Sequence, residues 1–372
     1  MPTVCHLLDQ HCGWEQLRGA QLLQSRAAVD GWQHIPVGMS RRLQPTLNER
    51  LSGASTIRGG SGWPLFDAVM LSRHMRQASP DICHAWSIDA AHAAGIAGMP
   101  RILLTLANPH DVVLHAKRLR TLQQSANLSI VSTSETTLRR LVEKGLDPER
   151  IVLIRPGVDF AEINRVKKSN LRDRLGVKRE DKLIVLGDTI RRKDALKDSF
   201  WALKLLGYLN GGYYGVIPRS GPENARIHRW ESKLLGYHTL LQPPRDATFE
   251  ALVSVADYFV LASRTEVSTT GIAWAMAAET LVIAPARYGV AEIIGSGLNG
   301  LLYKQPTETT QATEIVKCIH RDGQAKLREV ARGHAFEVFA AQKSVDQYLI
   351  LYDNILNGRK LDEGVTDTAL AS

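Results

Sequence analysis

Residues 263–303 read SRTEVSTTGIAWAMAAETLVIAPARYGVAEIIGSGLNGLLY, and this stretch is the most informative part of the chain. The apolar run DYFVLAS at 257–263 predicts a buried strand, and IAWAMAA at 272–278 predicts a helix. The turn between strand and helix carries one carboxylate and several hydroxyl groups, on Glu266, Ser268, Thr269 and Thr270. A helix N-terminus has unpaired N–H groups and a partial positive charge, so this turn could hold a phosphate. The alternative is an ordinary helix cap, because Ser and Thr are the usual N-cap residues.

Short apolar runs alternate with helical patterns in both halves of the chain. In the first half of the chain the strand-like runs are ICHAW, RILLTLA and LSIVST, and the cycle restarts at KLIVLGD. Such alternation predicts an α/β protein with two parallel sheets, each covered by helices on both faces. We place the linker at 161–182 and predict domains at 1–165 and 166–345, followed by the end of a bridging helix and a polar tail at 346–372.

The composition is that of a globular protein. Of the 372 residues, 44% are hydrophobic and 23% are charged, and no apolar run approaches the roughly 18 residues that span a bilayer. The N-terminal residues lack the features of a secretory signal. Four cysteines without a CxxC pair fit a reducing compartment, so we expect a cytoplasmic protein.

The charge balance points to an anionic partner. The net charge is +8 and the isoelectric point is about 9.3. The basic clusters lack aromatic interleaving and nucleic-acid motifs, which argues against nucleic acid and leaves phosphorylated substrates. Peripheral contact with the inner face of an anionic membrane stays open as well. We expect no catalytic metal, because there is no Asp-x-Asp and no pair of His or Cys at ligand spacing.

Residues 263–303 resemble the donor-site segment of retaining, nucleotide-sugar-dependent glycosyltransferases of family four, whose pattern is Ser, Glu-Gly, a short spacer, then Glu-Ala-Met-Ala. Glu266 matches the first glutamate of this pattern. Residues 131–163 have the family's order of strand, helix, Gly, Asp-Pro, strand and Pro-Gly-Val-Asp. Residues 221–223 (GPE) and 12–15 (CGWE) match parts of two further family turns. The resemblance implies the GT-B fold, two doubly wound Rossmann-like domains facing a cleft, with the acceptor on the first domain and the donor on the second.

The same resemblance assigns roles to particular residues. It makes Glu266 and Lys193 the catalytic groups, the first positioning the donor sugar and the second neutralising the leaving diphosphate. The donor-binding positions that it implies are Gly13, Arg191, Arg192, Ser268, Thr269, Thr270 and Trp274. It implies no cofactor, only a nucleoside diphosphate sugar as co-substrate.

Several positions depart from the family pattern. Asp188 stands where the family has an arginine of its diphosphate clamp, and Ala107 stands where relatives often carry a histidine. Trp274 replaces a second glutamate that binds the ribose, so its ring either packs in the core or stacks under a nucleobase. Glu279 replaces a glycine at the helix C-terminus, where glycine ordinarily relieves left-handed strain.

Two functions follow from these observations. The first is a retaining glycosyltransferase that moves a hexose from a nucleoside diphosphate sugar to a glycan, a lipid or a small acceptor. Its catalysis would be mostly electrostatic stabilisation and orientation. The alternative is a catalytically inactive, glycosyltransferase-like binding or scaffold protein, because each altered site position removes a polar contact.

Overall fold

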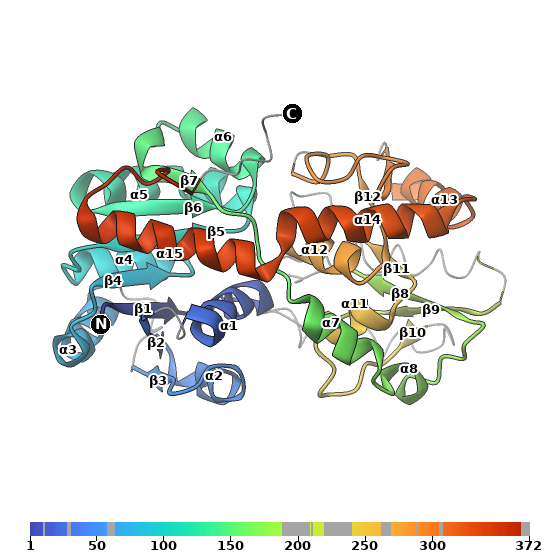
Figure 1. The fold of residues 1–372 in the computed structure, drawn as a ribbon, viewed down its shortest axis with the longest axis horizontal. Helices are drawn as coiled ribbons and strands as arrows, with labels where there is room; N and C mark the ends of the chain where they lie inside the picture. The colour runs from blue at the N-terminus through green and yellow to red at the C-terminus, as the bar shows by residue number, and fades with distance from the viewer. Residues whose placement is uncertain are drawn as a thin grey trace. The chain divides into compact units, whose positions relative to one another are not determined.

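The computed structural model describes residues 1–9, 12–27, 31–57, 64–187, 209, 211–218, 240–261, 269–287, 289–304 and 308–365. The chain forms two compact units (Figure 1). Unit 1 comprises Met1–Gly157 together with Ala341–Ser372, and unit 2 comprises Val158–Ala340. In the described part of the chain, no helix is both long enough and apolar enough to cross a membrane.

Unit 1 is built on a seven-stranded parallel sheet with the order β3-β2-β1-β4-β5-β6-β7. Its strands are β1 (Thr3–Leu8), β2 (Gln33–Gly38), β3 (Ser55–Thr56), β4 (Ile82–Ala85), β5 (Ile102–Leu106), β6 (Leu128–Ser132) and β7 (Ile151–Leu153). Its described helices are α1 (Trp14–Ala27), η2 (Arg41–Leu43), α2 (Gln44–Arg50), α3 (Pro64–Ala78), α4 (Ile88–Ile96), α5 (Pro109–Ser125), α6 (Glu135–Glu143), η3 (Pro148–Arg150) and α15 (Ala341–Asn357).

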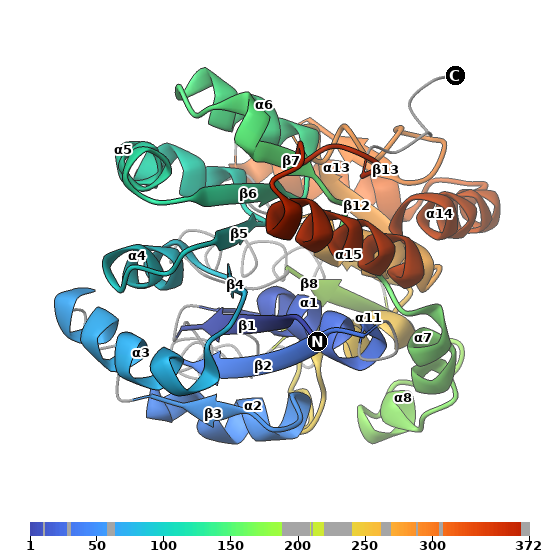
Figure 2. The ribbon, with the colours of Figure 1, turned by 60° about the vertical axis from the view of Figure 1, so that its left-hand side comes forward.

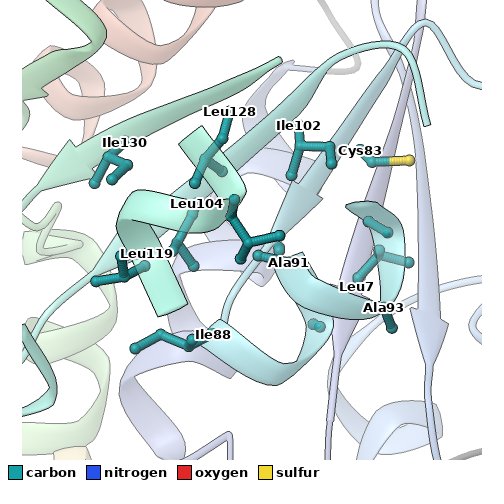
Figure 3. Close-up of a cluster of buried hydrophobic side chains, with 14 of the residues drawn as sticks. Leu7, Cys83, Ile88, Ala91, Ala93, Ile102, Leu104, Leu119, Leu128 and Ile130 are labelled. Atoms are coloured by element: carbon teal, nitrogen blue, oxygen red, sulfur yellow. The ribbon is translucent and has the colours of Figure 1, made fainter. Parts of the chain in front are cut away.

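The two faces of this sheet have separate hydrophobic cores. Alternate residues of a strand point to opposite faces, so Leu7 packs under α3 to α6 whereas Leu8 packs under α1, α2 and α15. Figure 3 shows the first core, which includes Leu104 and Ile130 of the strands and Leu119 of α5. Figure 2 shows α3, α4 and α5 side by side along one face of the sheet.

Unit 2 is built on a six-stranded parallel sheet with the order β10-β9-β8-β11-β12-β13. Its strands are β8 (Lys182–Leu186), β9 (Tyr213–Val216), β10 (Leu240–Leu241), β11 (Tyr258–Val260), β12 (Leu281–Pro285) and β13 (Leu301–Tyr303). Its described helices are α7 (Phe160–Lys167), α8 (Leu171–Arg174), α11 (Phe249–Val255), α12 (Thr269–Ala277), α13 (Glu308–Ile319) and α14 (Gln324–Phe339).

The predicted fold class is confirmed, because both units are parallel-sheet, Rossmann-like α/β structures. The division of the chain differs in detail from the predicted domains at 1–165, 166–345 and 346–372. The C-terminal helical region is two helices that separate at Ala340, and α15 belongs entirely to unit 1. The reason is packing, since Val345, Leu351 and other buried side chains of α15 lie in the core of unit 1.

Candidate functional site

In unit 2, the chain changes direction across the sheet between β8 and β11. From β8 the next strand, β9, lies on one side, whereas β11 lies on the other and leads to β12. Ligands of open α/β sheets bind at such a switch point, beyond the carboxyl ends of the strands. The two strands end together here, because the Gly187 N–H donates to the Val260 carbonyl at 2.9 Å. Gly187 has a φ of 77°, a conformation that glycine adopts without strain.

Helix α12 begins at Thr269, in the connection between β11 and β12. All nine residues of the helix are buried. The Thr269 side chain is 1% exposed, and its hydroxyl has no hydrogen-bond partner in the described part of the chain. Thr270, the next residue, is 6% exposed. Because the first turn of a helix presents free N–H groups and a partial positive charge, this end can receive an anion, with the Thr269 hydroxyl as a further donor.

Tyr303 holds the carboxyl end of β11 in place. Its side chain is 2% exposed, and its hydroxyl donates to the Leu261 carbonyl at 2.8 Å. Leu261 is the last described residue before the segment that carries Glu266. Sequence reasoning did not assign Tyr303 a role; the signal available to it was a hydroxyl group at the end of an otherwise apolar strand.

The opposite end of α12 confirms the expected left-handed residue. Glu279 has a φ of 60°, and its N–H donates to the Met276 carbonyl while the Thr280 N–H donates to the Ala275 carbonyl. The Glu279 carboxylate lies 2.7 Å from Lys167 Nζ. Although partial burial raises it, the pKa of Glu279 is lowered overall by this hydrogen bond and the positive charge of Lys167.

Trp274 lies in the middle of α12 and is a core residue in this structure. Its side chain is 1% exposed and is among the largest fully buried side chains of the chain. The core-packing interpretation of Trp274 is therefore the one that this conformation matches. Stacking under a nucleobase stays a prediction, and it would require the ring to become accessible.

Five residues that the sequence analysis assigned to the site lie outside the described residues. They are Glu266 and Lys193, both expected to be catalytic, and Arg191, Arg192 and Ser268, all expected to bind the donor. Asp188 lies outside as well. The structure does place the residues from which their segments depart, Gly187 and Leu261, at the ends of neighbouring strands.

Unit 1 has its own switch point, between β1 and β4. Asp9 follows β1 and Ser87 follows β4, and the Ser87 hydroxyl donates to Asp9 Oδ2 at 2.5 Å. Ser87 also caps α4 by accepting from the Ala90 N–H at 3.0 Å. Asp9 is 3% exposed. This edge therefore carries an oriented carboxylate that can accept hydrogen bonds from hydroxyl groups, a feature that the sequence analysis did not identify.

Gly13, a predicted donor-binding residue, lies at the same edge, immediately before α1. Its N–H donates to Gln16 Oε1 at 2.9 Å, so the glutamine reaches back to close the helix start. The Gly13 carbonyl accepts the first helical hydrogen bond from Leu17. In this conformation the Gly13 amide is occupied by its own helix, and a contact with the donor stays a prediction.

The position of Ala107 is followed by a helix cap. Asn108 accepts from the His110 N–H at 2.9 Å through Oδ1, and Pro109 begins α5. The Asn108 side chain is therefore the N-cap of α5.

A buried polar network lies on the face of the unit 1 sheet that α1 and α15 cover. Trp86 Nε1 donates to His6 Nδ1 at 3.1 Å, so neutral His6 carries its proton on Nε2. His6 Nε2 then donates to His34 Nδ1 at 2.7 Å, which places the His34 proton on Nε2. Burial, followed by the neighbouring histidines, lowers the pKa of His6 well below its usual value, and burial lowers the pKa of His34 to about 4.

His84 extends this network to α15. Its two ring nitrogens lie 2.7 Å from the Tyr352 hydroxyl and 2.8 Å from Thr105 Oγ1. Thr105 Oγ1 lies 2.9 Å from the Tyr348 hydroxyl. Burial is the main cause that lowers the pKa of His84 well below its usual value. Both tyrosines belong to α15, so the network fastens that helix to the centre of the sheet. In the described residues no group of three His, Cys, Asp or Glu side chains could hold a metal ion.

Family models match most of the chain. Residues 44–162 match Glycosyltransferase Family 4, and residues 167–335 match Glycosyl transferases group 1. No curated protein matches the sequence.

Solved structures share the fold over nearly the whole chain. A glycosyltransferase from Rickettsia africae ESF-5 has a TM-score of 0.73 at 18% identity, covering 95% of this chain and 98% of its own. HepE of Anabaena, in complex with UDP-glucose, has a TM-score of 0.74 at 16% identity, covering 95% and 100%. Sucrose-phosphate synthase from Thermosynechococcus elongatus has a TM-score of 0.74 at 16% identity, covering 96% and 100%. The chain is thus a glycosyltransferase of the GT-B fold, in which a Glycosyltransferase Family 4 segment precedes a group 1 segment.

Proposed function

We propose that the protein transfers a hexose from a nucleoside diphosphate sugar to a glycan, lipid-linked or small acceptor, with retention at the anomeric carbon. The observation that carries the proposal is the Thr269 hydroxyl, which is buried at the N-terminus of α12 without a partner among the described residues. Buried hydroxyl groups are nearly always hydrogen-bonded, so a donor left over at a helix N-terminus fits a ligand with phosphate oxygens.

The reaction needs no protein nucleophile in this proposal. The acceptor oxygen forms a bond to the anomeric carbon as the bond from that carbon to the diphosphate breaks, and the acceptor proton passes to a phosphate oxygen. Thr269, Thr270 and the first amides of α12 stabilise the departing diphosphate, together with Lys193 and the neighbouring arginines. Glu266 positions the sugar through its hydroxyl groups. The nucleoside diphosphate sugar is a co-substrate, and no other cofactor or metal is part of the proposal.

The choice of the first ligand to test comes from a relative. HepE binds UDP-glucose, so a uridine donor is the first to try on this chain. We place the reaction in the cytoplasm, with peripheral contact at the inner membrane face when the acceptor is lipid-linked.

The decisive experiment compares two threonine-to-valine variants. Thr269→Val removes the unpartnered hydroxyl and nearly keeps the side-chain shape, so the free energy of unfolding should stay the same or rise. Affinity for UDP and UDP-glucose should fall about tenfold to a hundredfold, because a hydrogen bond to a charged group contributes about 1.5–3 kcal/mol. Titration calorimetry measures the affinity, and urea unfolding measures the stability.

Thr280→Val is the matched control. Thr280 is also 1% exposed, but its hydroxyl donates to the Val253 carbonyl at 2.7 Å. This variant should lose about 1–2 kcal/mol of stability and keep its nucleotide affinity. Equal nucleotide affinities of wild type and Thr269→Val would show that the Thr269 hydroxyl does not bind the nucleotide, and the proposal would lose its main support. Absence of binding across uridine, guanosine and adenosine diphosphates and their sugars would overturn the proposal. Retention is tested separately, by the anomeric configuration of the product in NMR spectra.

A further inference from the structure

One face of unit 1 carries a concentration of exposed apolar side chains. On α3 these are Leu65, Phe66 and Val69, with exposed fractions of 70%, 45% and 58%. On α5 they are Val113 and Leu114, with 43% and 59%. They make up five of the twelve large hydrophobic residues that are exposed in the described part of the chain. Exposed apolar side chains that gather in one place mark a surface that meets a partner.

Each of the two helices changes from apolar to basic along its exposed face. On α3, Leu65 and Val69 are followed at helical spacing by the exposed Arg73 and Arg76. The side chains between them turn inward, as Leu71 and Met75 of the same helix are buried in the core. The exposed stripe of α3 is therefore apolar over its first two turns and cationic over its last two.

Helix α5 repeats the pattern. Val113 and Leu114 are followed by the exposed Lys117 and Arg120, while Leu119 of the same helix is buried. No ion pair involves Lys117 or Arg120 among the described residues. Two helices that are far apart in the sequence thus present the same order of apolar and cationic side chains.

The topology places the apolar first turns of both helices at the same edge of the sheet. Helix α3 leads into β4 and α5 leads into β6, and these strands are parallel. Both helices therefore run against the strands, with their first turns at the carboxyl edge of the sheet. Figure 2 shows them on the same face, with α4 between. The apolar residues Leu65, Phe66, Val69, Val113 and Leu114 form a band near the carboxyl edge, and Arg73, Arg76, Lys117 and Arg120 form a cationic band behind it; we call the two bands together the α3–α5 surface.

Negative charge on this surface is small. Asp67 of α3 is buried, Asp111 in the first turn of α5 is half-buried, and the exposed Asp89 of α4 is ion-paired with Arg118 of α5. A groove of about 510 Å³ lies between α4 and α5. Its lining includes the apolar Leu114 together with His92, Lys117 and Arg118. An apolar band followed by a band of lysine and arginine matches the two levels of a bilayer interface, where acyl chains lie below phosphate groups.

We infer that the α3–α5 surface docks on an anionic lipid bilayer, with the apolar band entering the interface and the cationic band meeting the lipid phosphates. The inference deepens the proposed function and rests on it for the acceptor, which it narrows to a membrane-borne molecule. The apolar band lies toward the same carboxyl edge as Asp9 and Ser87, so docking brings that edge close to the lipid surface. The acceptor can then reach unit 1 without leaving the membrane.

The test is co-sedimentation of the full chain with vesicles of phosphatidylcholine, either alone or mixed with phosphatidylglycerol. Wild type should bind the mixed vesicles at least about tenfold more strongly, because each nearby Lys or Arg contributes about 1 kcal/mol at an anionic surface. Binding should weaken as salt is added. Lys117→Glu/Arg120→Glu should lose at least about tenfold of the binding to mixed vesicles. Leu65→Ser/Leu114→Ser should weaken binding even at low salt.

The control variant is Lys168→Glu/Arg179→Glu, which changes two exposed basic residues of unit 2 and gives the same net charge. It should bind as wild type does. Equal losses in the two charge-reversal variants would overturn the inference, because binding would then follow net charge rather than this surface. The inference would also be overturned if wild type bound equally to vesicles with and without phosphatidylglycerol. It would be overturned as well if the serine variants changed only the oligomeric state in solution, because the partner of this surface would then be a second copy of the chain.

Separate measurements distinguish a protein that lacks the docking surface from one that lacks the donor site. Nucleotide titration without vesicles tests the site at Thr269, which lies in unit 2, and none of the surface substitutions falls there. Nucleotide binding without vesicle binding would refute the docking surface alone. Vesicle binding that is lost in Lys117→Glu/Arg120→Glu, in a protein that binds no nucleotide, would support the surface and refute the donor site.

Discussion

The buried histidine network makes the stability of unit 1 sensitive to mild acid. His6 and His84 are fully buried, and burial lowers the pKa of each well below the usual 6.5. Both therefore remain neutral in the folded protein at pH values where the unfolded chain binds protons. The unfolded state then binds more protons than the folded state, so the free energy of unfolding is highest above about pH 6.5 and falls as the pH drops.

The magnitude follows from proton linkage. A histidine that stays neutral in the folded state at pH 5 lowers the free energy of unfolding by about 1.9 kcal/mol between pH 7 and pH 5. His6 and His84 together should lower it by about 4 kcal/mol, a large part of the stability of an ordinary domain. His34 acts in the same direction until the pH approaches about 4, the value to which burial lowers its pKa.

The assay is urea unfolding at pH 7 and pH 5, with hydrogen exchange of peptides from β1 and β4 to report on unit 1 itself. His84→Gln removes one of the titrating groups, so its difference between the two pH values should be smaller than that of wild type by about 2 kcal/mol. The variant will be less stable at pH 7, because contacts to Tyr352 and Thr105 change, but the comparison uses only the pH difference. His320→Gln, at an exposed position in unit 2, is the control.

Two results would refute this reasoning. In the first, unit 1 of the wild type would be as stable at pH 5 as at pH 7. In the second, His84→Gln and His320→Gln would show the same pH difference as wild type, and the acid sensitivity would then come from other groups.

Two further pairs of substitutions test the backbone strain at Glu279 and the packing at Gly19. Glu279→Gly and Glu279→Ala both remove the ion pair with Lys167, but only glycine takes a φ of 60° without strain. In urea unfolding the glycine variant should therefore be more stable than the alanine variant by about 1 kcal/mol. Equal stabilities of the two variants would show that the backbone at this position is not strained. Gly19→Ala places a Cβ 2.5 Å from Cη2 of the buried Trp86 and should lower the free energy of unfolding by about 1–3 kcal/mol. Gly333→Ala, which has open space around it in α14, should raise the free energy of unfolding by up to about 1 kcal/mol. A higher melting temperature for Gly19→Ala than for wild type would contradict the packing argument.

Local patterns were enough to predict much of the architecture. Buried parallel strands are continuous apolar runs, which is why RILLTLA and KLIVLGD indicated β5 and β8 without knowledge of their partners. The left-handed residue at Glu279 was also predictable, because the end of a helix is a local event.

The first two strands of the chain, β1 and β2, were not predicted. β1 contains His6 and β2 contains His34, which interrupt the apolar pattern that identifies a buried strand. His6 is buried because Trp86 and His34 pair with its two ring nitrogens, and both partners are distant in the sequence. The pairing of Asp9 with Ser87 depends in the same way on β1 and β4 becoming neighbours.

Periodicity and capping act within a few residues of the chain. The sequence alone therefore predicts the α/β class, a helix that starts among the hydroxyl-bearing residues 268–270, and a left-handed residue at the end of that helix. Long-range packing makes Trp274 a core residue, places α15 in unit 1, and buries the Thr269 hydroxyl without a partner among the described residues. These outcomes depend on which distant segments exclude water from a side chain and which of them offer a hydrogen bond in its place.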